Sequence, residues 1–488
     1  MDRRRGTAGD RPDDSDAEDR VNRCATAYLR DAVEPSVSAV GWTIGSGPAV
    51  SAGRGVVATK DYAEGDVILV DAPLIVSPRT LTGVAESPVC PVCYVAPGLA
   101  ATGSCAGGCG LPVCSDRCSN DPAHADECRY VRRLRPKTDG SRWSAAVYNA
   151  VTAIRGLAVN GGAHKSFLDL LQKKFTDKPT VEVEELKKNI SMKLEEEDEQ
   201  IMTITCKIMD ANCFETIITR NNKLISLKGL YPVASFMNHC CVPNTMHNFN
   251  EKLQMIVKAS LPIYKGQEIT TTYTHLLWST SLRQNHLLTS KQFICTCYRC
   301  CDAEEFGTEL AALNCTVKNC SGRVLPVNPL NKFSVWQCKE CHKLVTSVEI
   351  TSLLKKLCPL MNSIQQCPKR FETILKTFNI YRNSTFVVDL RLKFIWKSKN
   401  NNLSLEELLY KEKSCVEVLN IVQKLGLGQC RLLGLISLEL LKVIEEKIDR
   451  FRWKTKTLNI FKEQISNLYK ISVSVLDGDA NTSITKKP

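Results

Sequence analysis

Short apolar runs, many of them β-branched and separated by glycine turns, predict β-strands in two parts of the chain. The first part lies at 53–60 and 65–70, and the second lies at 253–259 and 265–273. Between them, the stretch 229–244 is apolar as far as Met237 and then becomes polar and rich in sulfur. Its first half is typical of buried strands or short helices. We therefore expect this polar end to be anchored on a buried segment.

Helical periodicity dominates the other parts of the chain. Apolar residues recur at i, i+3 and i+4 between 129 and about 205, which predicts helices there. From 348 to about 475 the pattern is helical throughout, with a long Leu-rich amphipathic stretch at 432–448. At the N-terminus, 1–35 mixes both charge signs with Gly and Pro. We expect a disordered tail there, with a helix at 21–32.

Length and composition exclude several classes of protein. A chain of 488 residues is too long for one ordinary core, so about two to four domains are expected. No apolar run resembles a secretory signal or approaches the roughly 20 residues of a membrane span. The 24 cysteines cluster at metal-ligand spacings, which favours zinc thiolates in a reducing compartment over a disulfide framework. The net charge of +12 permits acidic partners or nucleic acid, but it is spread over the whole chain.

The densest group of metal-ligand candidates lies within 90–128. Its members are Cys90, Cys93, Cys105, Cys109, Cys114, Cys118, His124 and Cys128. Seven thiols and one imidazole satisfy two tetrahedral zinc sites. So short a segment, rich in Gly and Ala, cannot bury a core of its own and needs the metal to fold. Such fingers usually serve as scaffolds or bind partners, so this segment is not expected to catalyse.

A second group of thiols lies further along the chain. Cys295, Cys297 and Cys300 are three closely spaced thiols that need a fourth donor. Cys241, about fifty residues earlier, is the candidate. A shared zinc would tie the Asn238–His239 segment to the segment around Phe293, and the space between these segments would be the functional pocket. This site would have no open position for a catalytic water.

A third group consists of two thiol pairs at knuckle spacing. Cys315 and Cys320 form one pair, and Cys338 and Cys341 form the other. The two pairs predict a further zinc site, for which His342 is a competing ligand.

Three of these motifs resemble those of a known family. The stretch from Asn238 to Asn244, Asn-His-Cys-Cys-Val-Pro-Asn, is similar to the Asn-His-Ser-Cys-x-Pro-Asn signature of SET domains. The 295–300 thiols resemble the post-SET zinc motif, and 90–128 resembles a MYND zinc finger. Together they resemble the SET and MYND domain family of protein-lysine methyltransferases, most closely its arthropod branch, over roughly 45–345.

The resemblance implies an α+β multidomain fold. A β-rich SET domain would carry an inserted MYND zinc finger and a helical insert. A post-SET zinc site, an additional zinc-knuckle segment and a C-terminal α-helical domain of tetratricopeptide (TPR-like) type would follow. The expected boundaries are 40–89 for the N-terminal part of SET, 90–128 for the MYND finger, 129–200 for the helical insert, 201–275 for the SET core, 276–302 for post-SET, 303–345 for the additional zinc-binding segment, 346–475 for the C-terminal domain and 476–488 for a loose tail.

The resemblance also implies roles for single residues. S-adenosylmethionine would be the cofactor, and Tyr273 would be the catalytic hydroxyl. The cofactor would contact Gly53, Arg54, Gly55, Asn212, Asn238, His239, Tyr273 and Phe293. The lysine channel would be lined by Phe214, Tyr273 and Phe293. In the MYND finger, one zinc would take Cys90, Cys93, Cys114 and Cys118, and the other would take Cys105, Cys109, His124 and Cys128.

Four positions depart from the family pattern: Ala52, Cys240, Gln267 and Lys291. Lys291 matters most, because the family often has an aromatic residue there beside the target lysine. A cation at this position would repel that lysine unless it points to solvent. A thiol-protease arrangement of Cys240 with His239 is excluded, because adjacent residues rarely aim at each other and no third residue is visible to orient them.

The sequence leaves three functions open. The first is a protein-lysine N-methyltransferase acting on histone or non-histone proteins, expected in the nucleus, the cytoplasm or both. The second is a catalytically weak adaptor that recruits Pro-rich partners through the MYND finger in transcriptional repression; the four departures favour it. The third is DNA binding through a basic run, for which a solvated helix is the more common explanation. That run comprises Arg129, Arg132, Arg133, Arg135 and Lys137.

Overall fold

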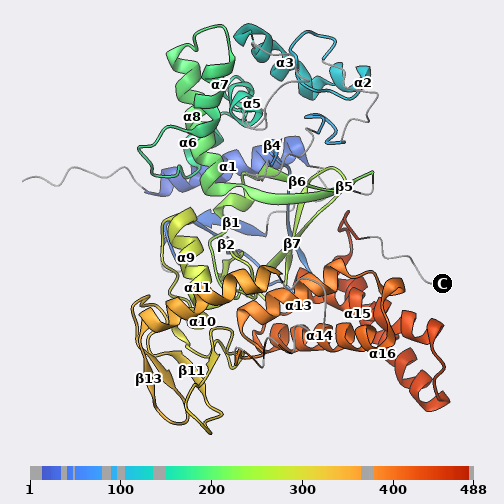
Figure 1. Ribbon diagram of the computed structural model, residues 1–488. Helices are drawn as coiled ribbons and strands as arrows, with labels where there is room; N and C mark the ends of the chain where they lie inside the picture. The colour runs from blue at the N-terminus through green and yellow to red at the C-terminus, as the bar shows by residue number, and fades with distance from the viewer. Residues whose placement is uncertain are drawn as a thin grey trace, which may run out of the picture.

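A computed structural model describes most of the chain (Figure 1). It covers residues 14–33, 41–47, 50–79, 89–95, 105–135, 150–221, 223–363, 373, 375, 377 and 379–482. The expectations for 1–13, for 136–149 with Lys137, and for 483–488 lie outside the described residues.

Three small antiparallel sheets form the middle of the molecule (Figure 1). The first contains β1 (Trp42–Gly45), β2 (Gly55–Ala58) and β9 (Glu268–Ile269); the second contains β3 (Val67–Asp71), β8 (Met255–Ala259) and β7 (Thr245–Phe249); the third contains β4 (Ile75–Pro78), β6 (Lys223–Leu230) and β5 (Phe214–Arg220). Each sheet combines a strand from before residue 80 with one from after residue 213. The strand-rich domain is therefore assembled from two distant parts of the chain.

The N-terminal helix begins earlier than the sequence suggested. We expected a tail with a helix at 21–32, but α1 spans Asp14–Ala32. Glu18 accepts a hydrogen bond from the backbone of Ser46, and the Asn22 side chain exchanges hydrogen bonds with the backbone of Ile44. These contacts with β1 and with the turn after it stabilise the first part of the helix. The charge composition of this segment does not reveal such contacts.

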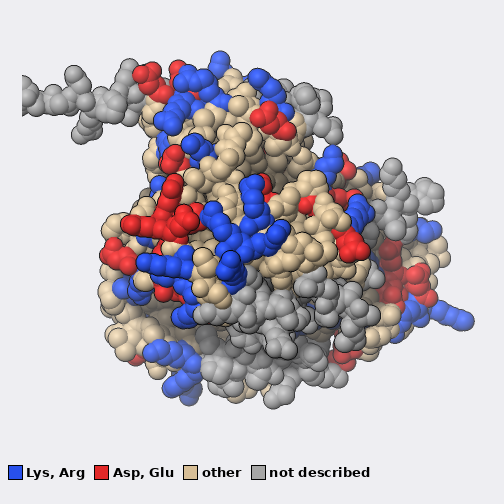
Figure 2. Space-filling view, turned by 90° about the horizontal axis from the view of Figure 1, so that it is seen from above, with Lys and Arg blue, Asp and Glu red and all other residues tan. Residues whose placement is uncertain are grey.

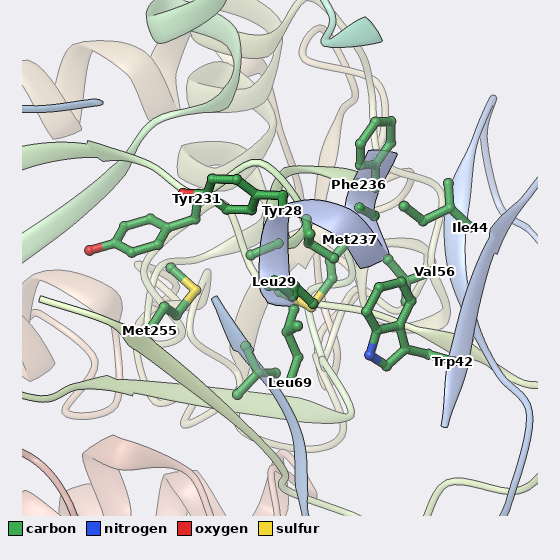
Figure 3. Packing of buried hydrophobic residues seen from close by; sticks show 14 of the residues in the cluster. Tyr28, Leu29, Trp42, Ile44, Val56, Leu69, Tyr231, Phe236, Met237 and Met255 are labelled. Carbon is green, nitrogen blue, oxygen red and sulfur yellow. The ribbon is translucent and has the colours of Figure 1, made fainter. Parts of the chain in front are cut away.

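The main core lies under this helix (Figure 3). Tyr28 and Leu29 of α1 are buried against the strands and against Tyr231 and Met237. Tyr231 precedes the short 3-10 helix η3 (Ala234–Phe236), and Met237 follows it. The buried carboxylate of Asp71 accepts hydrogen bonds from the backbone N–H groups of Val233 and Ala234, at 2.9 and 2.8 Å. These contacts hold the apolar half of the 229–244 stretch in the core, and the polar half extends from this anchored segment.

Helices between 116 and 212 lie above the sheets (Figure 1). They are α2 (Asp116–Ser119), α3 (Pro122–Leu134), α5 (Val151–Asn160), α6 (Ser166–Leu170), α7 (Val181–Asn189) and α8 (Glu196–Asn212). Side chains of Ser115 and Asp121 cap α2 and α3. Helix α8 leads directly into β5, so its C-terminal end reaches the sheet region that carries the site.

A small four-stranded sheet follows the strand-rich domain. Helix α9 (Thr280–His286), the π-helical turn η4 (Leu287–Lys291) and α10 (Tyr298–Cys301) come first. The antiparallel sheet then contains β10 (Leu313–Asn314), β11 (Arg323–Pro326), β12 (Trp336–Cys338) and β13 (Leu344–Val345).

Helices form the C-terminal part of the chain. They are α11 (Ser347–Ser363), α13 (Thr385–Lys397), the 3-10 turn η5 (Asn400–Asn402), α14 (Leu405–Lys424), α15 (Arg431–Arg450) and α16 (Thr455–Leu476). Ser404 and Glu407 form a capping box at the start of α14. The N–H of Gln429 donates to Ser260 and that of Ala480 donates to Phe249, so this part is bonded to the strand-rich domain. Among the described helices, none is long and apolar enough to cross a membrane. The tetratricopeptide character of these helices stays a prediction.

Candidate active site

A cavity of about 990 Å³ opens where the polar half of the 229–244 stretch meets five other segments. Its lining comes from 51–54, from 171–175 with 211 and 212, from 235–240, from 268–273 and from 290–297. The residues predicted to bind the cofactor are nearly all present in this lining: Gly53, Arg54, Asn212, Asn238, His239, Tyr273 and Phe293. Residues that lie up to 240 positions apart in the sequence are thus brought together.

Residues 51–54 of the glycine turn form one wall of the cavity, whereas Gly55, also predicted to contact the cofactor, is not part of the lining. Gly53 has a φ of +57°, in the left-handed region that glycine adopts readily. A Cβ on Gly55 would lie 2.6 Å from Oε1 of Glu268 and 2.9 Å from Nδ2 of Asn238. The turn therefore requires glycine at 55 for close packing. Arg54 donates to the carbonyl of Leu170 at 2.5 Å, so its guanidinium holds the turn against α6.

Asn238 fastens this turn to a neighbouring strand. Its Nδ2 donates to the carbonyl of Ala52 at 2.9 Å and to Oε1 of Glu268 at 2.7 Å. Glu268 also accepts a hydrogen bond from the N–H of Ser51 at 2.9 Å. Sequence reasoning did not assign Glu268 to the site. Its place directly after Gln267, in the segment that resembles the family motif, was the available signal.

Asn212, at the end of α8, is held differently. Its Nδ2 donates to the carbonyls of Gln172 and Ile208, both at 2.7 Å. Because these contacts use both N–H groups of the amide, only its oxygen is left to accept from a ligand. The predicted cofactor contact through Asn212 would therefore be an accepted hydrogen bond.

Tyr273 lies at the junction of three segments. Its hydroxyl donates to the carbonyl of Met237 at 2.7 Å, and its ring centroid lies 5.3 Å from that of His239 and 6.4 Å from that of Phe293. Burial, with a smaller contribution from Glu268, raises the pKa of Tyr273 to about 12. The phenol is therefore neutral near pH 7 and acts as a hydrogen-bonding group, not as a phenolate base.

Both ring nitrogens of His239 have protein partners. The backbone N–H of Tyr273 donates to Nδ1 at 2.9 Å, and Nε2 lies 3.2 Å from Sγ of Cys241. Because Nδ1 accepts, the neutral ring carries its proton on Nε2 and donates toward the sulfur. Burial lowers the pKa of His239 to about 4. His239 thus links Tyr273 to the thiol cluster, and a ligand would meet its ring face.

Phe214 lies outside the cavity lining. Phe214 is the first residue of β5. Its ring centroid is 6.0 Å from that of Tyr231 and 5.6 Å from that of His247. The structure thus joins Phe293, but not Phe214, to the cavity. A channel role for Phe214 stays a prediction.

The four departures from the family pattern now have defined surroundings. The backbone of Ala52 still takes part, through its carbonyl. Gln267 accepts from the N–H of Tyr264 at 3.0 Å and closes the turn before β9. Cys240 lines the cavity. Lys291 does not point to bulk solvent: its Nζ donates to the carbonyl of Ala211 at 2.6 Å and lies 5.4 Å from the ring centroid of Tyr273.

Four groups of side chains could each hold a metal ion. The groups are Cys90, Cys93, Cys114 and Cys118; Cys105, Cys109, His124 and Cys128; Cys241, Cys295, Cys297 and Cys300; and Cys315, Cys320, Cys338 and Cys341. Within each group the ligand atoms all lie within 4.8 Å of one another. Tetrahedral zinc with Zn–S distances of about 2.3 Å requires sulfur–sulfur distances of roughly 3.8 Å. Sγ of Cys241 lies 3.9 Å from that of Cys295 and 3.4 Å from that of Cys300, so the donors fit zinc.

These groups match the ligand sets expected from the sequence. His342, the competing ligand for the fourth group, is not a member of it. His124 has a carboxylate partner in Glu127, 3.1 Å from its Nδ1, which leaves Nε2 for the metal. Arg155 in turn donates to Glu127 at 2.6 Å and to the carbonyl of Pro91 at 2.8 Å. This chain of contacts ties the finger to α5.

A buried ionic cluster supports the thiols of Cys241 and Cys300, and motif reasoning missed it. Nε of Arg283 lies 3.1 Å from Sγ of Cys241, and its NH2 group lies 3.4 Å from Sγ of Cys300. Glu305 accepts from Arg283 at 2.6 Å and from Arg299 at 3.0 Å. Burial alone would lower the pKa of Arg283, but Glu305 and the two thiols raise it. A fixed cation therefore faces the sulfur cluster.

Comparison with known proteins agrees with this arrangement. A model of the SET domain matches residues 53–274. The SET domain-containing protein SmydA-8, isoform A, of Drosophila melanogaster is 30% identical over 82% of this chain and 88% of its own length. The histone-lysine N-methyltransferase ASHR1 of Arabidopsis thaliana is 24% identical, over 62% of this chain and 65% of its own length. N-lysine methyltransferase SMYD2 of Bos taurus is 33% identical over a shorter region, 18% of this chain and 20% of its own.

Among solved structures, the comparison found that of Rubisco LSMT bound to AdoMet. Its sequence is 12% identical to this one, the match covers 94% of this chain and 89% of the LSMT chain, and the TM-score is 0.34. This likeness is too low to support an argument. The relationship rests on the SET match, the Drosophila relative and the thiol groups. The chain therefore belongs to the SET and MYND domain protein family.

Proposed function

We propose that this protein is an S-adenosylmethionine-dependent protein-lysine N-methyltransferase. The observation that carries the proposal is the hydrogen bond from the Tyr273 hydroxyl to the Met237 carbonyl. Tyr273 lines a cavity whose walls also include Gly53, Arg54, Asn238 and Phe293. Two relatives, from Arabidopsis thaliana and Bos taurus, are named as lysine methyltransferases, which supports the same activity.

The lining residues fit a nucleoside-type ligand that carries an amino acid group. The turn at 53–55 brings backbone close to the cavity, and Asn212 leaves an oxygen free to accept a hydrogen bond. Asn238 and Glu268 hold that turn in place. When bound, S-adenosylmethionine supplies an electrophilic methyl group on a sulfonium.

The chain's own groups then have to orient an amine. A lysine amine, whose ordinary pKa is about 10.4, must lose its proton before it can act as a nucleophile. Desolvation in the cavity and nearby positive charge both favour the neutral amine. The Tyr273 oxygen, whose proton is directed at Met237, offers lone pairs to an amine hydrogen. Tyr273 thereby orients the nitrogen without serving as a strong base, and the released proton passes to solvent.

The zinc at Cys241 would have a structural role. All four of its ligands are thiols, which leaves no open position for water or substrate. His239 connects this cluster to the backbone of Tyr273. The metal would therefore hold the segments that contain Tyr273 and Phe293 in a fixed position relative to each other.

Calorimetry and a methylation assay test the proposal together. We expect the full chain to bind S-adenosylmethionine and to transfer its methyl group to lysines on a peptide array. Asn238→Ala should abolish binding, because the 52–54 turn loses its anchor. Asn402→Ala, at an exposed position in η5, is the matched control and should bind as the parent does. A parent chain that holds its zinc but binds no S-adenosylmethionine would rule out the enzyme.

The substrate and the partners are finer parts of the proposal. We propose histone or non-histone proteins as substrates and the nucleus or the cytoplasm as compartment, which suits a chain rich in zinc thiolates. We also propose that the MYND finger binds Pro-rich co-repressor peptides. Its two ligand groups are closed and leave no position for chemistry. Peptide pull-down with the parent and with a Cys114→Ser variant tests that role.

DNA binding by the basic run has weaker support. Seen from above, the face that carries α3 and α7 shows Lys and Arg beside Asp and Glu side chains (Figure 2). Arg129 pairs with Asp126, and Arg133 pairs with Asp198. These pairs neutralise part of the charge that phosphate contacts would require. Absent or salt-insensitive DNA retention would dismiss this role.

A further inference from the structure

Lys291 fixes an ammonium group inside the cavity. It ends the π-helical turn η4, and its side chain is part of the cavity lining. Nζ donates to the carbonyl of Ala211 at 2.6 Å and lies 5.4 Å from the centroid of the Tyr273 ring. A long side chain that could reach solvent is instead held over the ring of Tyr273, whose hydroxyl is proposed to orient the amine.

The surroundings of Lys291 favour its charged form in some respects and oppose it in others. Ala211 belongs to the last turn of α8, where the free carbonyls carry the negative end of the helix dipole. The Tyr273 ring face also attracts a cation. Burial lowers the pKa of Lys291, and the neighbouring Lys174 lowers it further, while Cys213 and Asp210 oppose that shift. The helix end and the ring thus hold the ammonium where it is.

We infer that Lys291 is a specificity-determining residue, which makes the cavity favour the neutral thioether product over the cationic methyl donor. The inference rests on the proposed function and adds to it. S-adenosylmethionine carries a sulfonium, whereas S-adenosylhomocysteine, which remains after methyl transfer, has an uncharged sulfur at the same place. A fixed cation repels the first and has no such effect on the second.

This preference has a consequence for regulation. Two unit charges separated by about one Debye length, at an effective dielectric constant of about 20, shift an affinity ratio by roughly 3- to 30-fold, depending on how much salt screens them. The protein would then be inhibited by its own product at product levels well below those of the donor. Its turnover would follow the ratio of donor to product and depend on a reaction that removes the thioether.

Four variants separate the charge of Lys291 from its hydrogen bond. Lys291→Gln removes the charge and keeps a donor for Ala211, and Lys291→Met removes both. Lys291→Arg keeps the charge. Lys193→Gln is the control, because Lys193 is exposed and lies outside the cavity lining. The zinc content and thermal unfolding of each full chain show whether it has folded, and Lys291→Met with Lys291→Arg suffices if Lys291→Gln does not fold.

The measurement is the dissociation constant of each variant for S-adenosylmethionine and for S-adenosylhomocysteine by calorimetry. We expect the donor-to-product ratio of these constants to fall at least about threefold in Lys291→Gln and Lys291→Met. In Lys291→Arg and Lys193→Gln it should stay within about twofold of the parent.

Three results would overturn the inference. If both ligands bind and the neutral variants keep the parent ratio, the inference is wrong while the proposed function stands. If both constants rise by one common factor, Lys291 only holds the wall in place. If the parent binds neither ligand, the proposed function fails, and this inference fails with it.

Discussion

Nε of Arg283 donates to Sγ of Cys241 over 3.1 Å, in a fully buried contact. A guanidinium cannot lose its proton here, so it places a permanent positive charge against the sulfur. Four thiolates around one zinc carry a net charge of about −2, which is costly to bury. Arg283 offsets part of that charge, and Glu305 neutralises one of the two positive charges of Arg283 and Arg299, so that the three groups keep a net charge of about +1.

Replacing Arg283 by Met should therefore destabilise the post-SET zinc site. Loss of one partner from a buried ionic cluster costs about 3–5 kcal/mol. We expect a fall of that size in the free energy of unfolding, measured in denaturant, and faster release of one zinc to a chelator. Arg452→Met, at an exposed position, is the control and should leave both unchanged. Equal zinc release from the two variants would show that Arg283 does not support the cluster.

Removal of the Tyr273 hydroxyl should impair methyl transfer more than cofactor binding. In Tyr273→Phe the Met237 carbonyl loses its donor, and the amine loses the oxygen that would orient it. We expect kcat to fall by about 10²- to 10³-fold, the cost of losing one positioned hydrogen-bonding group. The dissociation constant for S-adenosylmethionine should change little. Tyr264→Phe, at an exposed tyrosine, is the control, and unchanged kcat in Tyr273→Phe would remove Tyr273 from its role.

Loss of a thiol ligand should affect S-adenosylmethionine binding at one zinc site but not at another. Cys241→Ser should lower the zinc content by one and abolish S-adenosylmethionine binding, because the Tyr273 and Phe293 segments lose their common anchor. Cys315→Ser should also lower the zinc content by one but leave binding intact, since its group lies in the separate sheet β10–β13. Native mass spectrometry counts the zinc, and calorimetry measures binding. Retained binding in Cys241→Ser would contradict the anchoring role.

Asp71 should make stability depend on pH. Burial raises its pKa from 3.8 to about 7, although backbone N–H groups of Ala234 and Val233 oppose the shift. Between these two values the folded state binds the proton more tightly than the unfolded state does, so this contribution to stability is present at low pH and is lost as pH rises toward 7.

Comparison with Asp71→Asn isolates that contribution. From pH 5.5 to 7 the free energy of unfolding of the parent, relative to the variant, should fall by about 2 kcal/mol, at 1.36 kcal/mol per pKa unit. Asp169→Asn, at an exposed position, should follow the parent. A difference that rises with pH would mean that the hydrogen bonds to η3 outweigh burial and keep Asp71 ionised.

Local spacing was enough to predict the thiol groups. Ligands such as Cys90 and Cys93, or Cys338 and Cys341, are close in sequence, and a tetrahedral metal imposes the same short spacings in any fold. The strands at 65–70 and 253–259 were also visible, because alternation is a local pattern. Even Cys241 could be proposed as the fourth ligand, because three thiols leave one position unfilled.

Contacts between distant segments could not be predicted in this way. The early start of α1 depends on the hydrogen bonds of Glu18 to Ser46 and of Asn22 to Ile44. Phe214 lies outside the cavity lining and packs against Tyr231 and His247. Glu268 entered the site only through its contacts with Ser51 and Asn238. No periodicity or motif records such pairings, since each depends on the register of strands far apart in the chain.

The sequence by itself determined which residues can bind zinc and which family they resemble, because ligand type and spacing follow from coordination chemistry. Only the tertiary structure decided where the charges lie. It placed Arg283 against the thiols and directed Lys291 at Ala211 inside the cavity. The physical reason is that a charged side chain takes its role from burial and from its partners, and both are set when distant segments pack together.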